Sequence, residues 1–166
     1  MPHDPEVAAE TRAWLTKATL DLRAAAHEFT ATPPLVDDIV FHAQQAAEKA
    51  FLTWQQATFR KTHNLEEIGE QCLAFDSSPK AIIDRAVPLT EYAWRFRYPG
   101  ETETVDEPEA RQALKTDAQD VYDAVLARLP DAVHPPSLLS LADRRSNEDE
   151  APGDCVGNDD DTDSGG

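Results

Sequence analysis

Histidine and arginine are the side chains of this sequence that could act on a phosphate ester. Cleavage of RNA without a metal needs a base for the 2′-hydroxyl proton and a cation for the charged phosphorane, and these roles suit His and Arg. His63 follows Arg60 and Lys61, and Arg95 and Arg97 lie further along the chain. If the fold brings these segments together, they form a basic cluster that could bind phosphate. The alternative is a helix-capping histidine with solvated arginines.

A second group of polar residues lies on the segment 41–49. On a helix, positions 42, 45 and 49 share one side, and positions 41, 44, 45 and 48 share another. Buried amides need hydrogen-bond partners, so an interhelical network or a dimer interface is the ordinary interpretation, and a nucleotide pocket is the alternative. An ion pair between Asp21 and Lys49 would be structural. The residues assigned to the network or interface are Asp21, His42, Gln44, Gln45 and Glu48.

Metal chemistry has no support in the sequence. There is no His-Glu-x-x-His motif, and the two cysteines, Cys72 and Cys155, do not form a closely spaced pair. We therefore expect no metal, no cofactor and no disulfide framework, which fits a reducing compartment.

The charge balance limits how the protein could contact nucleic acid. The 15 Lys and Arg against 32 Asp and Glu give a formal net charge of −17. Such a field repels phosphate backbones, so any contact with RNA or a nucleotide must come from a local basic cluster. The dense carboxylates, with more Arg than Lys, also suggest a halophilic protein from a high-salt cytoplasm, with an ordinary acidic protein as the alternative.

Apolar residues recur at the three- and four-residue steps of amphipathic helices. The predicted helices cover about residues 7–29, 35–54, 64–75, 79–97 and 110–129. The second is rich in alanine and apolar on two sides, so we place it at the centre. Asn64 is suited to cap the third helix, and Pro88 predicts a kink or break in the fourth. The predicted fold is an all-α, antiparallel up-and-down bundle of four to five helices.

The chain is long enough for one domain and a tail. We predict a helical bundle over residues 1–130 and a disordered acidic tail over 131–166, because the tail has too few apolar residues to offset its ordering entropy. The sequence has no basic leader and no apolar run long enough to cross a membrane. We expect a cytoplasmic protein without membrane association.

The run Phe-His-Ala-Gln-Gln-Ala-Ala-Glu-Lys-Ala at residues 41–50 closely resembles the pattern of the HEPN family. The segments 14–18 and 21–25 before it, His63-Asn64-Leu65 after it and Arg97-Tyr98-Pro99 before the last helix follow the family order. The resemblance covers about residues 10–130. It implies a helical bundle that is frequently a homodimer and often pairs with a minimal nucleotidyltransferase in toxin-antitoxin-like systems.

Several branches of this family are metal-independent ribonucleases, in which an arginine is followed after four to six residues by a histidine near the start of the last long helix. Here no histidine follows Arg95 or Arg97 until His134. The formal match from Arg128 to His134 contains Pro130, which breaks a helix, so we regard it as a chance match. The ribonuclease motif is therefore absent from a suitable helix, and enzymatic activity stays open.

The sequence favours a non-catalytic nucleotide- or RNA-associated protein that dimerises and partners a nucleotidyltransferase. One alternative is a divergent metal-independent ribonuclease toxin that uses His63 with Arg95 or Arg97. Another is a structural scaffold that binds only protein. The residues expected to contact a nucleotide or RNA are Arg97, Tyr98, Arg95, His63 and Lys49.

Overall fold

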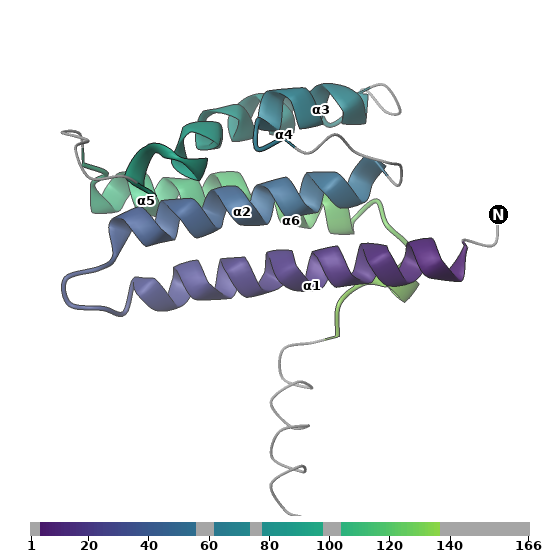
Figure 1. The fold of residues 1–166 in the computed structure, drawn as a ribbon, viewed down its shortest axis with the longest axis horizontal. Helices are drawn as coiled ribbons and strands as arrows, with labels where there is room; N and C mark the ends of the chain where they lie inside the picture. The colour runs from purple at the N-terminus through teal and green to yellow at the C-terminus, as the bar shows by residue number, and fades with distance from the viewer. Residues whose placement is uncertain (1–3, 56–61, 74–77, 98–103, 137–166) are drawn as a thin grey trace, which may run out of the picture. The chain divides into compact units, whose positions relative to one another are not determined.

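The computed structural model describes residues 4–55, 62–73, 78–97 and 104–136. The α-helices are α1 (Pro5–Glu28), α2 (Val36–Gln55), α3 (Leu65–Leu73), α4 (Lys80–Ala86), α5 (Glu107–Gln112) and α6 (Gln119–Leu126). Shorter helical elements are η1 (Val87–Ala93), η2 (Arg95–Arg97), the π-helical η3 (Ala113–Ala118) and η4 (Asp131–Val133). No strand occurs in these ranges, and the predicted all-α bundle is confirmed (Figure 1).

Helices α1 and α2 form an antiparallel hairpin (Figure 1). Asp4 caps α1, since its Oδ1 accepts a hydrogen bond of 2.9 Å from the backbone N–H of Glu6, and Pro5 suits the first helical position. At the other end, the N–H of Leu35 donates to the carbonyl of Glu28 at 3.3 Å and closes the connection. Buried residues of α1 then face the core: Leu15, Ala18, Leu22 and Ala25.

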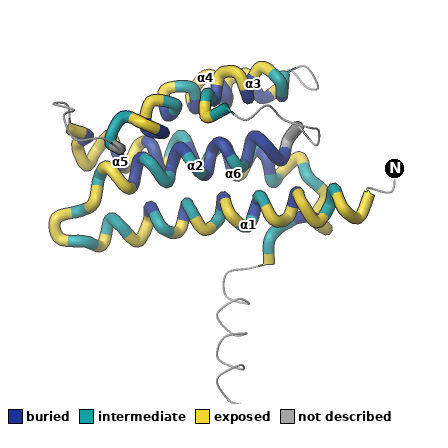
Figure 2. The backbone as a smooth tube through the Cα atoms, viewed as in Figure 1, coloured by how far each residue is buried: buried dark blue, intermediate teal, exposed yellow. Residues whose placement is uncertain are grey.

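Helix α2 is the central element, as the sequence predicted. It contacts α1, α3, α5, α6, η1 and η3, and Figure 2 shows it as the most continuously buried helix. Its small side chains let neighbouring backbones approach, and its larger ones fill the core. The fully buried apolar residues of α2 are Ile39, Val40, Ala43, Ala46, Ala47, Ala50 and Phe51.

Helix α3 begins where the sequence predicted and packs closely on α4. The Oδ1 of Asn64 accepts hydrogen bonds from the N–H groups of Glu66 at 2.9 Å and Glu67 at 3.4 Å. Gly69 is required by the close approach, because a Cβ at this position would lie 2.3 Å from Cγ2 of Ile83.

Proline ends the regular part of the fourth predicted helix. The α-helical hydrogen bonds of α4 end at Ala86, and the chain continues as the 3₁₀-helix η1 with Pro88 in its first turn. The predicted break is therefore confirmed.

The last predicted helix begins earlier than expected and is not uniform. Asp106 caps it by accepting from the N–H of Glu109 at 2.8 Å, so the helix begins at Glu107. The π-helical turn η3 separates α5 from α6, a feature that we did not predict.

The compact unit continues beyond the predicted boundary at residue 130, up to Pro135. Val133 of η4 is buried, and Arg12 of α1 donates to the carbonyl of Ala132. The predicted tail lies outside the described residues from position 137 onward. Among the described helices, none has the length and apolar character needed to cross a membrane.

Gly69→Ala should destabilise the protein by about 1–3 kcal/mol, because the added methyl group clashes with Ile83. Urea unfolding followed by circular dichroism measures the effect. The control is Glu70→Ala, an exposed change on the same helix. The clash is relieved in the double variant Gly69→Ala/Ile83→Ala, so its loss of stability should be smaller than the sum of the two single losses. Strict additivity would contradict the close approach.

Candidate functional site

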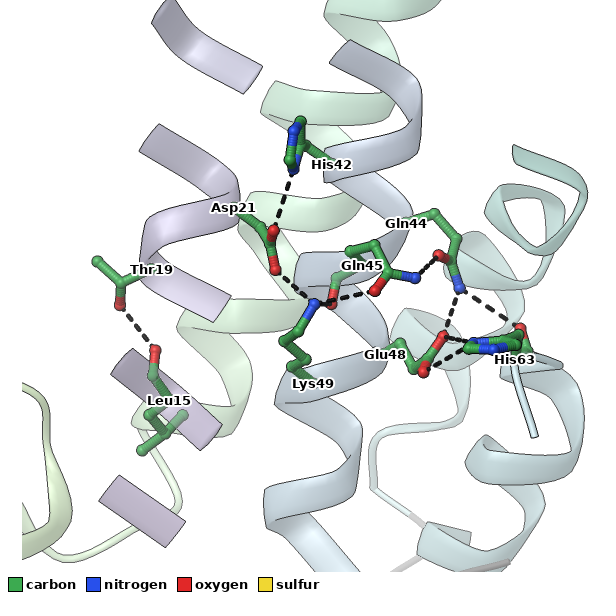
Figure 3. Close-up of polar contacts among 9 residues, drawn as sticks. All are labelled: Leu15, Thr19, Asp21, His42, Gln44, Gln45, Glu48, Lys49 and His63. Atoms are coloured by element: carbon green, nitrogen blue, oxygen red, sulfur yellow. Dashed lines mark hydrogen bonds and ion pairs between the residues drawn. The ribbon is translucent and has the colours of Figure 1, made fainter. Parts of the chain in front are cut away.

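A connected row of polar side chains runs across α2, from α1 to the residues before α3. We call it the polar chain. Figure 3 shows its members except Glu28, joined by hydrogen bonds and ion pairs. The polar chain consists of Glu28, His42, Asp21, Lys49, Gln45, Gln44, Glu48 and His63.

Asp21 joins α1 to α2. Its Oδ2 accepts from Nζ of Lys49 at 2.6 Å, and its Oδ1 lies 3.0 Å from Nδ1 of His42. The predicted pairing of Asp21 with Lys49 is therefore present, and each of these two side chains is only 16% exposed. Nε2 of His42 lies 3.4 Å from Oε1 of Glu28, so the imidazole sits between two carboxylates.

Gln44 and Gln45 continue the chain along α2. Nζ of Lys49 donates to Oε1 of Gln45 at 3.0 Å, and Nε2 of Gln45 donates to Oε1 of Gln44 at 2.7 Å. Nε2 of Gln44 donates to Glu48 at 2.8 Å and to the backbone carbonyl of His63 at 3.4 Å. Gln44 is fully buried, and its amide is satisfied within the chain.

Glu48 and His63 form the other end of the polar chain. The two carboxylate oxygens of Glu48 lie 3.1 and 3.0 Å from Nδ1 of His63. The Glu48 side chain is 10% exposed and the His63 side chain is 68% exposed. A buried carboxylate thus orients an imidazole at the surface, while Gln44 donates a hydrogen bond to the same carboxylate.

Glu28 is the one described residue with a buried side-chain polar atom, Oε2, that has no hydrogen-bond partner in the structure. Burial raises the pKa of Glu28 above its ordinary value, His42 opposes this shift, and Asp38 adds to it. The carboxylate form of Glu28 is therefore held at a cost in free energy.

Arg95 has different partners from His63. Its Nη1 donates to Oε1 of Glu91 at 3.1 Å, and its guanidinium lies 5.2 Å from the ring centroid of Phe96. The side chain of Arg97 and all of Tyr98 lie outside the described residues. Arg60 and Lys61, which the sequence placed in the same basic cluster, also lie outside these residues, so the predicted cluster with His63, Arg95 and Arg97 stays a prediction.

Arg128 and His134 hold the end of the last helix. Arg128 donates to the carbonyl of Ala124 at 3.0 Å and to Oγ of Ser78 at 2.9 Å. Nε2 of His134 lies 3.0 Å from the carbonyl of Leu126. Both side chains therefore stabilise the backbone at the end of α6. This role agrees with the interpretation that their match to the ribonuclease spacing is due to chance.

Sequence reasoning missed a small pocket between the start of α2 and the segment η1–η2. We call it the aromatic pocket; its volume is about 250 Å³, and it is lined by Asp37, Asp38, Phe41, Tyr92 and Phe96. The rings of Tyr92 and Phe96 are stacked, with centroids 6.1 Å apart and planes inclined by 22°. The four-residue spacing of Tyr92 and Phe96 indicates that their rings lie on the same side of a helical segment. It does not show that Phe41 of α2 lines the same pocket.

Tyr92 is fixed in the wall of the aromatic pocket. Its hydroxyl donates to Oε1 of Glu109 at 2.5 Å. Burial raises the pKa of Tyr92, and the hydrogen bond to Glu109 raises it further. The hydroxyl therefore stays protonated as a donor, and the ring is held in one orientation.

The three tryptophans fall on or beside the apolar stripes of the sequence, and this pattern predicts that they lie in the core or at an interface. Trp14 packs against the core, the Trp54 side chain lies outside the described residues, and Trp94 is 56% exposed. Trp94 is therefore not a core residue of this chain, and an interface role for it stays a prediction.

The fold and the polar chain define an all-α domain whose buried central helix carries interlocked amide and charged side chains. A family model described as HEPN domain matches residues 11–128. The chain belongs to the HEPN family. The searches of curated proteins and of solved structures found no match.

Gln44→Leu should lower the free energy of unfolding by about 1–3 kcal/mol, because it removes the partners of Gln45 and Glu48 inside the protein. Chemical unfolding of the variant measures this loss. Gln112→Leu, an exposed change on α5, is the control and should stay within about 0.5 kcal/mol of the parent protein. Equal stability of the two variants would show that the amide of Gln44 does not support the fold.

Glu28→Gln should raise the melting temperature at pH 7 to 8, because the neutral amide avoids the cost of a buried carboxylate. The folded pKa of Glu28 is raised, so its contribution to stability is present in acid and is lost as the pH rises through that pKa. The advantage of the variant should therefore shrink toward pH 4.

Thermal melts across this pH range provide the measurement. Glu10→Gln, an exposed change on the same helix, is the control and should alter the melting temperature little at any pH. If Glu28→Gln melts below the parent protein at pH 8, the contact with His42 outweighs burial and the assignment is wrong.

Proposed function

We propose that this chain is a nucleotide- or RNA-associated HEPN protein that does not cleave RNA through the arginine–histidine motif of the family. The family match over residues 11–128 carries the proposal. The contacts of Arg128 and His134 with the end of α6 support the non-catalytic part, since both side chains already hold the backbone there.

Phosphate contact is assigned to Arg95, Arg97 and Tyr98, the residues that precede the last helix. The net charge of −17 makes a local site necessary. Arg95 lies on Phe96 and is 15% exposed, so a ligand phosphate would compete with Glu91 for its guanidinium. Lys49 is a weaker candidate than the sequence suggested, because Asp21 and Gln45 already use its ammonium group.

The proposal extends to assembly: a homodimer that works beside a minimal nucleotidyltransferase in a toxin-antitoxin-like system. This part rests on what family membership implies. The exposed Trp94 is compatible with a protein contact, because large aromatic side chains are enriched at interfaces.

A divergent metal-independent ribonuclease is the second candidate, and the contact of Glu48 with His63 favours it. A carboxylate that orients an imidazole is a common way to prepare a general base. Nε2 of His63 has no protein partner within the described ranges, and the side chain is 68% exposed. This nitrogen could therefore accept a proton from a 2′-hydroxyl, if an arginine is brought to the same phosphate.

Purified full-length protein incubated with total RNA and EDTA separates the two candidates. The binding proposal predicts intact RNA with the parent protein and with His63→Ala. Metal-independent cleavage that is lost in His63→Ala or Arg97→Ala would establish the ribonuclease instead.

The same preparations test binding. Filter binding with a labelled single-stranded RNA and equilibrium dialysis with ATP and GTP should show an affinity that Arg97→Ala reduces by about tenfold, equivalent to about 1.4 kcal/mol. Arg23→Ala, an exposed arginine of α1, is the matched control for the loss of one positive charge and should retain the affinity. If the parent protein binds neither RNA nor nucleotide, the proposal is wrong, and a structural scaffold that binds only protein becomes the better interpretation.

A further inference from the structure

The aromatic pocket combines two chemical features that favour one kind of ligand. Phe41, Tyr92 and Phe96 supply ring surfaces, and Asp37 and Asp38 supply carboxylates at the opening turn of α2. Ring faces carry partial negative charge and attract cations, and carboxylates bind cationic N–H donors. None of the five described lining residues is positively charged.

The two carboxylates are available to a ligand. Asp37 and Asp38 are exposed, and neither makes a hydrogen bond or an ion pair within the part of the chain that the structure describes. Their position in the first turn of α2 is favourable through the helix dipole. The dipole does not account for the aromatic walls beside them, and two of these rings, Tyr92 and Phe96, come from a distant part of the sequence.

The size and shape of the pocket restrict the ligand further. A volume of about 250 Å³ lies below the range of about 300–1,000 Å³ typical of small-molecule sites, so it suits one side chain. The chain already places guanidinium groups over phenylalanine rings: Arg95 lies 5.2 Å from Phe96 and Arg111 lies 4.8 Å from Phe29. A guanidinium stacks on rings and binds a carboxylate through two parallel N–H groups, which an ammonium cannot do.

We propose that the aromatic pocket binds an arginine side chain of a basic partner protein. The guanidinium stacks against the rings and donates to Asp37 and Asp38. The overall charge of −17 attracts a basic partner from a distance, and the pocket then selects arginine. This site adjoins the phosphate contacts proposed above, since Arg95 lies over Phe96, but it differs from them in having acidic polar groups, Asp37 and Asp38.

The test uses the full chain and a five-residue peptide with a central arginine flanked by glycines and blocked at both ends. Matched peptides carry lysine or citrulline, a neutral isostere of arginine, at the centre. Binding is followed through the aromatic NMR signals of Phe41, Tyr92 and Phe96 at about 0.15 M ionic strength. The arginine peptide should shift these signals, and the lysine and citrulline peptides should bind about tenfold more weakly or worse.

Asp37→Asn/Asp38→Asn should weaken the arginine peptide by at least about tenfold, a loss of about 1.4 kcal/mol. The matched control is Glu66→Gln/Glu67→Gln, which removes two exposed carboxylates from the first turn of α3. The control should bind as the parent protein does. Phe41→Leu tests the aromatic wall separately and should weaken binding while the fold, monitored by the remaining NMR signals, is kept.

Three results would overturn the proposal. Equal loss in the two double variants would show that only the overall negative charge attracts the peptide. Equal affinity for the arginine and citrulline peptides would show that no cation is selected. Shifts of the same aromatic signals by single-stranded RNA but not by the arginine peptide would make the pocket a nucleobase site.

Discussion

The near-complete burial of α2 is the constraint on which the rest of the structure depends. After its exposed first turn, this helix is surrounded by α1, α3, α5, α6 and η1, so its polar side chains have little access to water and must be satisfied within the protein. Gln44 shows the result, since it has no exposed surface and yet its amide is bonded to Gln45, Glu48 and the backbone of His63. The same network ties α1 to the residues before α3.

The polar chain also gives a structural role to the polar residues of the segment 41–50. His42, Gln45 and Lys49 share one stripe of α2, where Asp21 of α1 contacts His42 and Lys49, and Lys49 donates in turn to Gln45. The alanines of α2 are fully buried, and their small side chains allow neighbouring helices to pack closely. One helix therefore carries a packing face and a polar face, and both are built into the residues 41–50.

Local signals made most of the fold predictable. Apolar periodicity predicted the helices. Asn64 caps the helix that follows it and Pro88 interrupts the helix that contains it, so both effects could be predicted from the local sequence. The pairing of Asp21 with Lys49 followed from the expectation that their two helices are adjacent. The π-helical turn η3 was not predictable in this way, because a single shifted turn hardly changes the spacing of apolar residues. The aromatic pocket was also missed, since Phe41 and Phe96 line one pocket only because η1 packs against α2 and η2 follows η1.

The return of the chain after α6 determines where the folded unit can be cut. The family match ends at residue 128, but His134 covers carbonyl groups at the end of α6 and Arg12 reaches forward to the carbonyl of Ala132. A fragment that ends at residue 128 would lose these contacts of Arg12 and His134 and would expose the apolar surface that Val133 covers. The N-terminal helix is thus held by residues that follow the end of the family match, and the compact unit that contains these contacts extends to Pro135.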